Sequence, residues 1–123
     1  MDHVTRRNLL HVSTAVETAT GLLLILAPGL PCRLLLGVEA AGEVALLARF
    51  FGVTLLCLGI ACWPGGDPVA PRSARAMLLY NALIALFLAG VGLGLGPEPG
   101  GGVLLWPAVA LHAAIAALLA VRR

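Results

Sequence analysis

Four long apolar stretches dominate this chain and restrict what it can fold into. They cover residues 8–27, 42–63, 73–94 and 103–121, and each has close to the ~20 residues that an α-helix needs to cross a bilayer. Runs rich in proline and glycine separate them. The period-two alternation typical of a membrane barrel is missing from the pattern. The sequence therefore predicts one all-α domain over residues 1–123, a polytopic membrane four-helix bundle.

The composition favours a bilayer over water as the solvent. Hydrophobic residues make up 60% of the 123 residues and charged residues only 11%, which leaves too little polar surface to cover a soluble domain of this size. The formal net charge of +2 is too small to indicate nucleic acid as a partner. We therefore expect contact with membrane lipid, no binding of nucleic acid, and no separate soluble catalytic domain within this sequence.

The arginines predict how the chain is oriented. If the four stretches cross the membrane in turn, three arginine pairs fall on one side and a single arginine, Arg33, falls on the other. Because arginine is enriched on the cytoplasmic side, both termini are expected to be cytoplasmic. The bias toward Ala, Gly, Leu and Arg, without lysine, indicates a bacterial chain in the inner membrane. The three pairs are Arg6 with Arg7, Arg72 with Arg75, and Arg122 with Arg123.

One segment between the first two stretches is too short to cross. Residues 30–39 contain Pro31, Arg33 and three consecutive leucines. Such a short and partly apolar segment is expected to lie in the membrane interface.

Each apolar stretch carries a polar or ionisable side chain near its middle. At ~1.5 Å of rise per residue, Glu17, Asn81 and His112 lie roughly 12–13 Å from the cytoplasmic ends of their helices, and Arg49 roughly 20 Å. Such groups persist in hydrocarbon mainly when they face one another or a cavity. The sequence therefore predicts a polar core formed by Glu17, Arg49, Tyr80, Asn81 and His112.

Glu17 allows two interpretations. It is either a carboxylate that binds a proton or a ligand, or one half of a structural ion pair with Arg49. A charge at the centre of a bilayer costs about 2.5–3.5 kcal/mol on insertion scales, so a partner is expected in both cases. Its face of the helix is expected to point inward, because small or polar residues lie three and four positions away: Ser13, Thr14, Thr20 and Gly21.

The remaining polar residues permit weaker statements. His112 and His11 differ in depth by roughly 9 Å, which disfavours ligation of a haem by both. His112 and Glu17 alone are too few donors for a metal, so we expect no metal and no cofactor. Tyr80 and Asn81 either orient the head of an amphiphile or tie helices together.

The cysteines form no C-x-x-C motif and are expected to act as packing residues. They are Cys32, Cys57 and Cys62.

Three short motifs resemble small uncharacterised bacterial four-span membrane proteins that are distantly similar to the DoxX-like group. They are residues 55–63 (LLCLGIACW), Tyr80-Asn81 and residues 106–112 (WPAVALH). The resemblance covers most of the chain and implies a four-helix membrane fold. It carries no catalytic residues across.

These observations leave three functions open. The first is a protein that binds a lipid-like small molecule or a partner's helix at the polar core, or serves as an accessory subunit in a homo-oligomer or larger membrane complex. The second is a proton-coupled exporter using Glu17, against which stand Arg49 and only 5% aromatic residues. The third is a membrane enzyme that acts on a lipophilic substrate with Glu17 and His112 as acid and base. Because no catalytic triad, P-loop or zinc motif is present, we favour the first.

Overall fold

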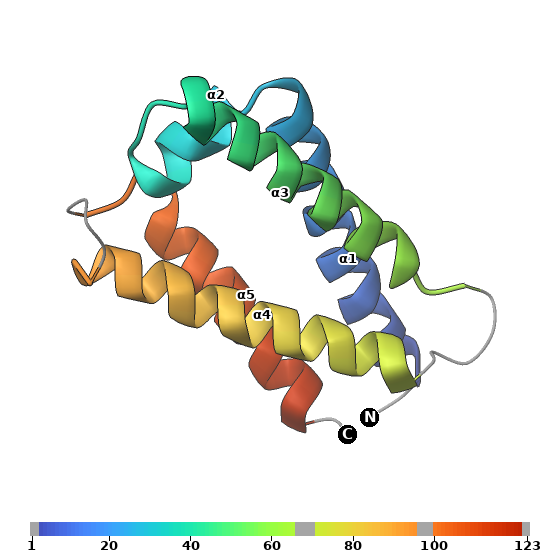
Figure 1. Ribbon diagram of the computed structural model, residues 1–123. Helices are drawn as coiled ribbons and strands as arrows, with labels where there is room; N and C mark the ends of the chain where they lie inside the picture. The colour runs from blue at the N-terminus through green and yellow to red at the C-terminus, as the bar shows by residue number, and fades with distance from the viewer. Residues whose placement is uncertain (1–2, 66–70, 96–99, 122–123) are drawn as a thin grey trace.

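The computed structural model describes residues 3–65, 71–95 and 100–121, and its regular elements in these ranges are all helical (Figure 1). The predicted all-α class is therefore confirmed. Arg122 and Arg123, used above to predict orientation, lie outside the described residues. In chain order the elements are α1 (His3–Leu26), α2 (Gly29–Pro31), the π-helical turn η1 (Cys32–Leu36), α3 (Gly42–Ala61), α4 (Pro71–Gly92) and α5 (Leu105–Val121).

Three of these helices are long and apolar enough to cross a membrane. They are α1 over Val4–Leu26, α3 over its full length, and α4 over Arg72–Gly92. Helix α5 is also apolar but has 17 residues, which corresponds to a length of ~26 Å. The predicted stretch 103–121 is longer than α5 because Leu104 is held outside the helix, where its N–H donates to the Leu34 carbonyl oxygen at 2.8 Å.

Helices α1 and α3 form a closely packed pair (Figure 1). Two glycines face each other at their crossing: a Cβ on Gly21 would lie 2.7 Å from the Gly52 carbonyl oxygen, and a Cβ on Gly52 equally close to that of Gly21. Gly59 on α3 meets Thr18 of α1 in the same way. Small residues permit this approach because nothing stands between the two backbones. A larger side chain at Gly21 or Gly52 would force the pair apart.

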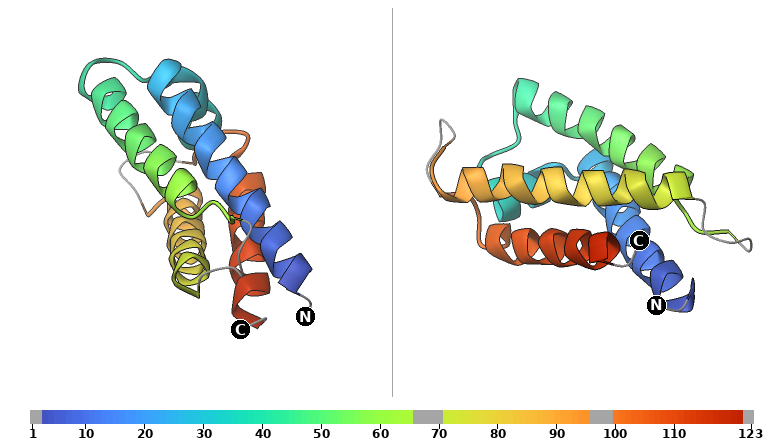
Figure 2. Two further views of the ribbon diagram at one scale, coloured as in Figure 1. Left: turned by 90° about the vertical axis from the view of Figure 1, so that its right-hand side faces the viewer. Right: turned by 90° about the horizontal axis from the view of Figure 1, so that it is seen from below.

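Helices α4 and α5 form a second pair, and the two pairs come together at one end of the molecule (Figure 1). That end holds the start of α1 and the end of α5, which also lie near each other in both views of Figure 2. A cluster of buried side chains fills it: Leu10, Cys62, Ala74, Met77, Ile115 and Leu119. The pairs are thus joined by an apolar core at this end.

At the opposite end, α2 and η1 lie between the two pairs and keep them apart (Figure 1). The turn η1 ends at Gly37, whose φ of 71° is a left-handed conformation that glycine adopts without strain. The N–H of Gly102 donates to the Leu35 carbonyl oxygen at 2.9 Å, which joins η1 to the segment leading into α5. Of residues 30–39, expected to lie in an interface, those up to Leu36 thus form a helical crosspiece tied by backbone hydrogen bonds.

Candidate functional site

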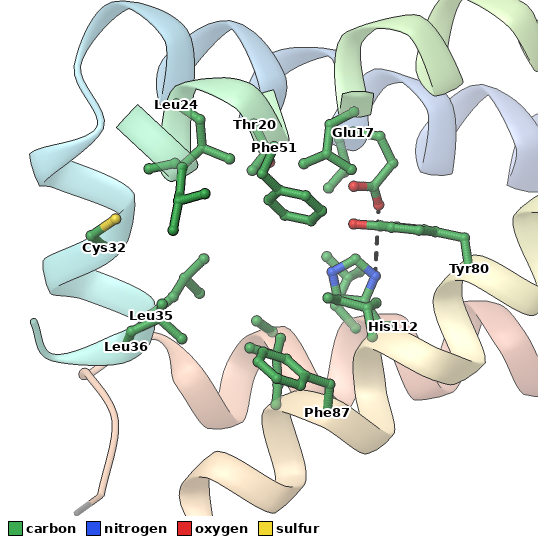
Figure 3. Close-up of a pocket in the computed structure, with 18 of the residues that line it drawn as sticks. Glu17, Thr20, Leu24, Cys32, Leu35, Leu36, Phe51, Tyr80, Phe87 and His112 are labelled. Carbon is green, nitrogen blue, oxygen red and sulfur yellow. Dashed lines mark ion pairs between the residues drawn. The ribbon is translucent and has the colours of Figure 1, made fainter. Parts of the chain in front are cut away.

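Three of the predicted polar residues meet in one buried cluster. Glu17 of α1, Asn81 of α4 and His112 of α5 are 1%, 0% and 8% exposed. His112 Nδ1 lies 2.8 Å from Asn81 Oδ1. The same nitrogen lies 3.7 Å from Glu17 Oε1, the contact drawn as a dashed line in Figure 3. The cluster therefore joins both helix pairs through polar side chains.

Asn81 determines which nitrogen of His112 carries a proton. Its Nδ2 donates to Ser13 Oγ at 2.8 Å and to the Met77 carbonyl oxygen at 2.7 Å, which uses both amide hydrogens. The side-chain oxygen Oδ1 can only accept, so the Nδ1–H of His112 is the donor in their hydrogen bond. The neutral imidazole is thereby fixed with Nε2 as an acceptor.

Tyr80 completes the polar end of the site. Its half-buried ring packs edge-on to the ring of His112, with centroids 6.0 Å apart and an interplanar angle of 82°. Its hydroxyl points toward the Glu17 carboxylate (Figure 3). Among the described residues, Glu17 Oε1 is buried and has no hydrogen-bond partner. A buried acceptor in that condition costs free energy until a donor reaches it.

Arg49 does not belong to this cluster, which corrects its predicted place in the polar core. It is exposed, and its Nε donates to the Ile25 carbonyl oxygen at 3.2 Å. Ile25 lies in the last turn of α1, where carbonyl groups lack partners within the helix and a cation is favourable. Arg49 therefore caps α1 at a point ~12 Å along the helix from Glu17. Over residues 3–65, 71–95 and 100–121, the basic partner of Glu17 is His112, so the interpretation of a Glu17–Arg49 pair is wrong.

A cavity of about 620 Å³ adjoins the cluster between the two helix pairs. Glu17, Tyr80 and His112 line one part of it (Figure 3). The rest of the wall is almost entirely apolar and includes the labelled side chains Leu24, Leu35, Leu36, Phe51 and Phe87. Its size falls within the ~300–1,000 Å³ of typical small-molecule sites. The site is therefore an apolar chamber with polar groups gathered in one region.

Sequence reasoning missed the part of the wall that η1 supplies. Cys32, Leu35 and Leu36 face the chamber, although their segment was expected to lie flat in an interface (Figure 3). The signal was the run of three leucines in a segment too short to cross a bilayer. Such a run needs another apolar surface of the protein to cover it. Ser13 was placed correctly on the Glu17 face, but its role as the acceptor for Asn81 depends on how α4 packs.

The cysteines and the metal-ligating residue types add no second site. All three cysteines are free thiols, and burial raises the pKa of the Cys32 thiol above its ordinary value. Because a thiolate is the reactive form, this lowers the reactivity of Cys32 at neutral pH. In the part of the chain that the structure describes, no group of three or more His, Cys, Asp or Glu side chains is placed to hold a metal ion.

No protein family, no curated protein and no solved structure matches this chain. The resemblance to the DoxX-like group stays a prediction from the sequence. The function must therefore be argued from the polar cluster and the chamber beside it.

Proposed function

We propose that this protein is a four-span membrane protein of the bacterial inner membrane that binds a lipophilic small molecule in the chamber between its two helix pairs. The head of the ligand lies against Glu17, Tyr80 and His112, and its apolar body extends toward η1. One observation carries this proposal: a buried carboxylate oxygen without a hydrogen-bond partner lies at the wall of an otherwise apolar cavity.

The outer surface supports the membrane setting. Large apolar side chains point outward from the helices, among them Leu46, Phe50 and Leu86, which are 67%, 73% and 71% exposed. Soluble monomers rarely expose so much contiguous apolar surface, whereas lipid tails would cover it. Helix α5 is a few ångströms shorter than a ~30 Å hydrocarbon core, a mismatch that local thinning of the bilayer accommodates.

The path of the chain supports the proposal that both termini lie on the same side of the membrane. Four crossings return the chain to its starting side, and α1 begins near the point where α5 ends (Figure 2). Arg6, Arg7, Arg72 and Arg75 all belong to the helix starts at that end. By the positive-inside rule, this end is the cytoplasmic one in our proposal.

The exporter alternative is weaker in this fold. An exporter must open its site alternately to both sides of the membrane. The apolar core of Leu10, Met77 and Ile115 fills the bundle between the polar cluster and the end where α1 begins. Release in that direction would require the core to separate. Binding at a site reached from the chamber side needs no such movement.

Photochemical labelling in lipid nanodiscs tests the proposal. The probe is dodecanol with a diazirine in its chain, which attaches covalently to residues near the chain on illumination. We expect saturable labelling of chamber residues such as Leu36 and Phe51, because a defined site fills at a limiting probe concentration. Phe50, next in sequence but directed outward, should be labelled in proportion to the probe in the lipid.

Two substitutions sharpen this test. Leu36→Trp adds a large side chain inside the chamber and should abolish the saturable labelling. Leu46→Trp makes the same change on the outer surface and should leave that labelling intact. Labelling of the chamber that never saturates in the unmodified protein would refute a binding site there.

A further inference from the structure

The hydrogen-bonding groups of the polar cluster are almost all assigned within the protein. Asn81 donates its two amide hydrogens to Ser13 Oγ and the Met77 carbonyl oxygen, and its Oδ1 accepts from His112 Nδ1. Thr14 donates to the Leu10 carbonyl oxygen at 2.7 Å. These bonds use the hydrogens of Asn81 and Thr14, and neither these two residues nor Ser13 lines the chamber. Of the cluster, Glu17, Tyr80 and His112 line the chamber, together with Thr20 one turn further along α1.

The groups that remain for a ligand are acceptors. Glu17 Oε1 has no partner, and Nε2 of neutral His112 carries a lone pair because Nδ1 holds the proton. The neutral imidazole is the form consistent with burial, since a charged ring would have to be removed from water. The Tyr80 hydroxyl is directed at Glu17, within the cluster (Figure 3). Glu17 Oε1 and the lone pair of His112 Nε2 thus both require a donor from the ligand.

We infer that the ligand of this chamber carries a hydrogen-bond-donating head, an alcohol or a primary amine, on an apolar body. This inference rests on the proposed function and adds the chemistry of the head. Such a head donates to Glu17 Oε1 or His112 Nε2. An ester, ether or ionised carboxylate brings only acceptors and leaves Glu17 Oε1 without a donor. Sites built for hydrogen bonding discriminate strongly against analogues that leave a buried group unpaired.

A competition experiment with matched heads tests this inference. The unmodified protein in nanodiscs is labelled with the diazirine dodecanol while an unlabelled competitor is added. Dodecanol and dodecyl methyl ether share their chain and oxygen and differ only in the hydroxyl hydrogen. We expect dodecanol to compete at a concentration at least about fivefold lower than the ether, which is the lower limit expected when a buried acceptor loses its donor. Dodecylamine should compete like the alcohol or better.

Substitution of the acceptor gives a second measurement. Glu17→Gln has nearly the same shape but supplies amide hydrogens, so it can donate to the oxygen of the ether. The preference for dodecanol over the ether should therefore shrink in Glu17→Gln. Glu43→Gln, the same change at an exposed carboxylate in the first turn of α3, should keep the full preference.

The outcomes separate the two proposals. If the ether competes as well as dodecanol, the chamber binds lipophilic molecules but the inferred head chemistry is wrong. The same holds if dodecanoate competes better than dodecanol at a pH where it is ionised. If neither alcohol, amine, ether nor carboxylate reduces chamber labelling, the binding function fails and the inference fails with it.

Discussion

Helix α1 has two faces that are held to the rest of the molecule by opposite means. Toward α3 it presents Gly21, which was expected on the Glu17 face, and there the backbones approach so closely that no Cβ fits. Toward α4 and α5 it presents Ser13 and Glu17, which meet Asn81 and His112 through polar atoms. The interface with α3 depends on glycines that have no side chain, whereas the interface with α4 and α5 depends on contacts between polar side chains.

The difference shows how a small helical protein can be rigid and hollow at once. Close contact between α1 and α3 leaves no room for a guest, because the two backbones fill the space between them. The polar interface spans a wider gap, since side chains of the length of Glu17 and His112 must reach across it. Glu17 and His112 of this wider interface line the chamber, whereas neither Gly21 nor Gly52 does.

The largest expected effect comes from breaking the glycine interface. Gly52→Ala would place a Cβ 2.7 Å from the Gly21 carbonyl oxygen and 2.8 Å from Leu24 Cβ, and backbone cannot move aside cheaply. We expect a loss of about 1–3 kcal/mol in the free energy of unfolding, measured by denaturant titration in detergent micelles. Gly29→Ala is the matched control, because a Cβ there meets nothing within 4 Å. A stabilised Gly52→Ala variant would contradict the close contact.

The next effect comes from removing the shared amide of the polar interface. Asn81→Leu keeps the branched shape and the number of side-chain heavy atoms but deletes the bonds to Ser13 and His112, so the free energy of unfolding should fall by about 1–2 kcal/mol. The preference for dodecanol over its methyl ether should also shrink, because Nδ1–H of His112 is no longer fixed, while Glu17 Oε1 still accepts. Thr54→Val removes an exposed hydroxyl bonded within its own helix and should change neither quantity. Retention of the full preference in Asn81→Leu would show that Asn81 does not control the His112 proton.

The smallest effect is expected at Arg49, outside both interfaces. Arg49→Met removes the cap on α1 and should lower the free energy of unfolding by about 0.3–1 kcal/mol. In a double-mutant cycle with Glu17→Gln, the two effects should add to within about 0.5 kcal/mol, because the residues act at different sites. A larger coupling energy would restore the ion pair that the structure replaces with a helix cap.

The sequence predicted the polar cluster better than the space around it. Glu17, Asn81 and His112 were expected at one depth because helical rise converts position in the chain into distance along a helix. Arg49 was misplaced because that estimate ignores the carbonyl groups at the end of α1 that lack partners within the helix. Binding a cation there costs less desolvation free energy than pairing it with a buried carboxylate two turns away. The all-α class followed from apolar stretches that local composition defines.

The chamber and its wall at η1 could not be predicted in this way. The chamber depends on the angle at which two helix pairs diverge, and that angle is set by contacts between residues far apart in the chain. Leu34 and Leu35 join the segment before α5 through their carbonyl oxygens, which every residue type possesses. No pattern of side chains marks such a contact in a sequence.

This use of main-chain atoms affects how the protein tolerates change. The turn η1 separates the chamber from its surroundings like a partition. It is held by hydrogen bonds from the N–H groups of Leu104 and Gly102 to the carbonyl oxygens of Leu34 and Leu35, and these bonds do not depend on which side chains η1 carries. Mutations in η1 can therefore reshape the volume available to a guest while the partition itself stays in place. Evolution could adjust the length of accepted molecules here without rebuilding the helices.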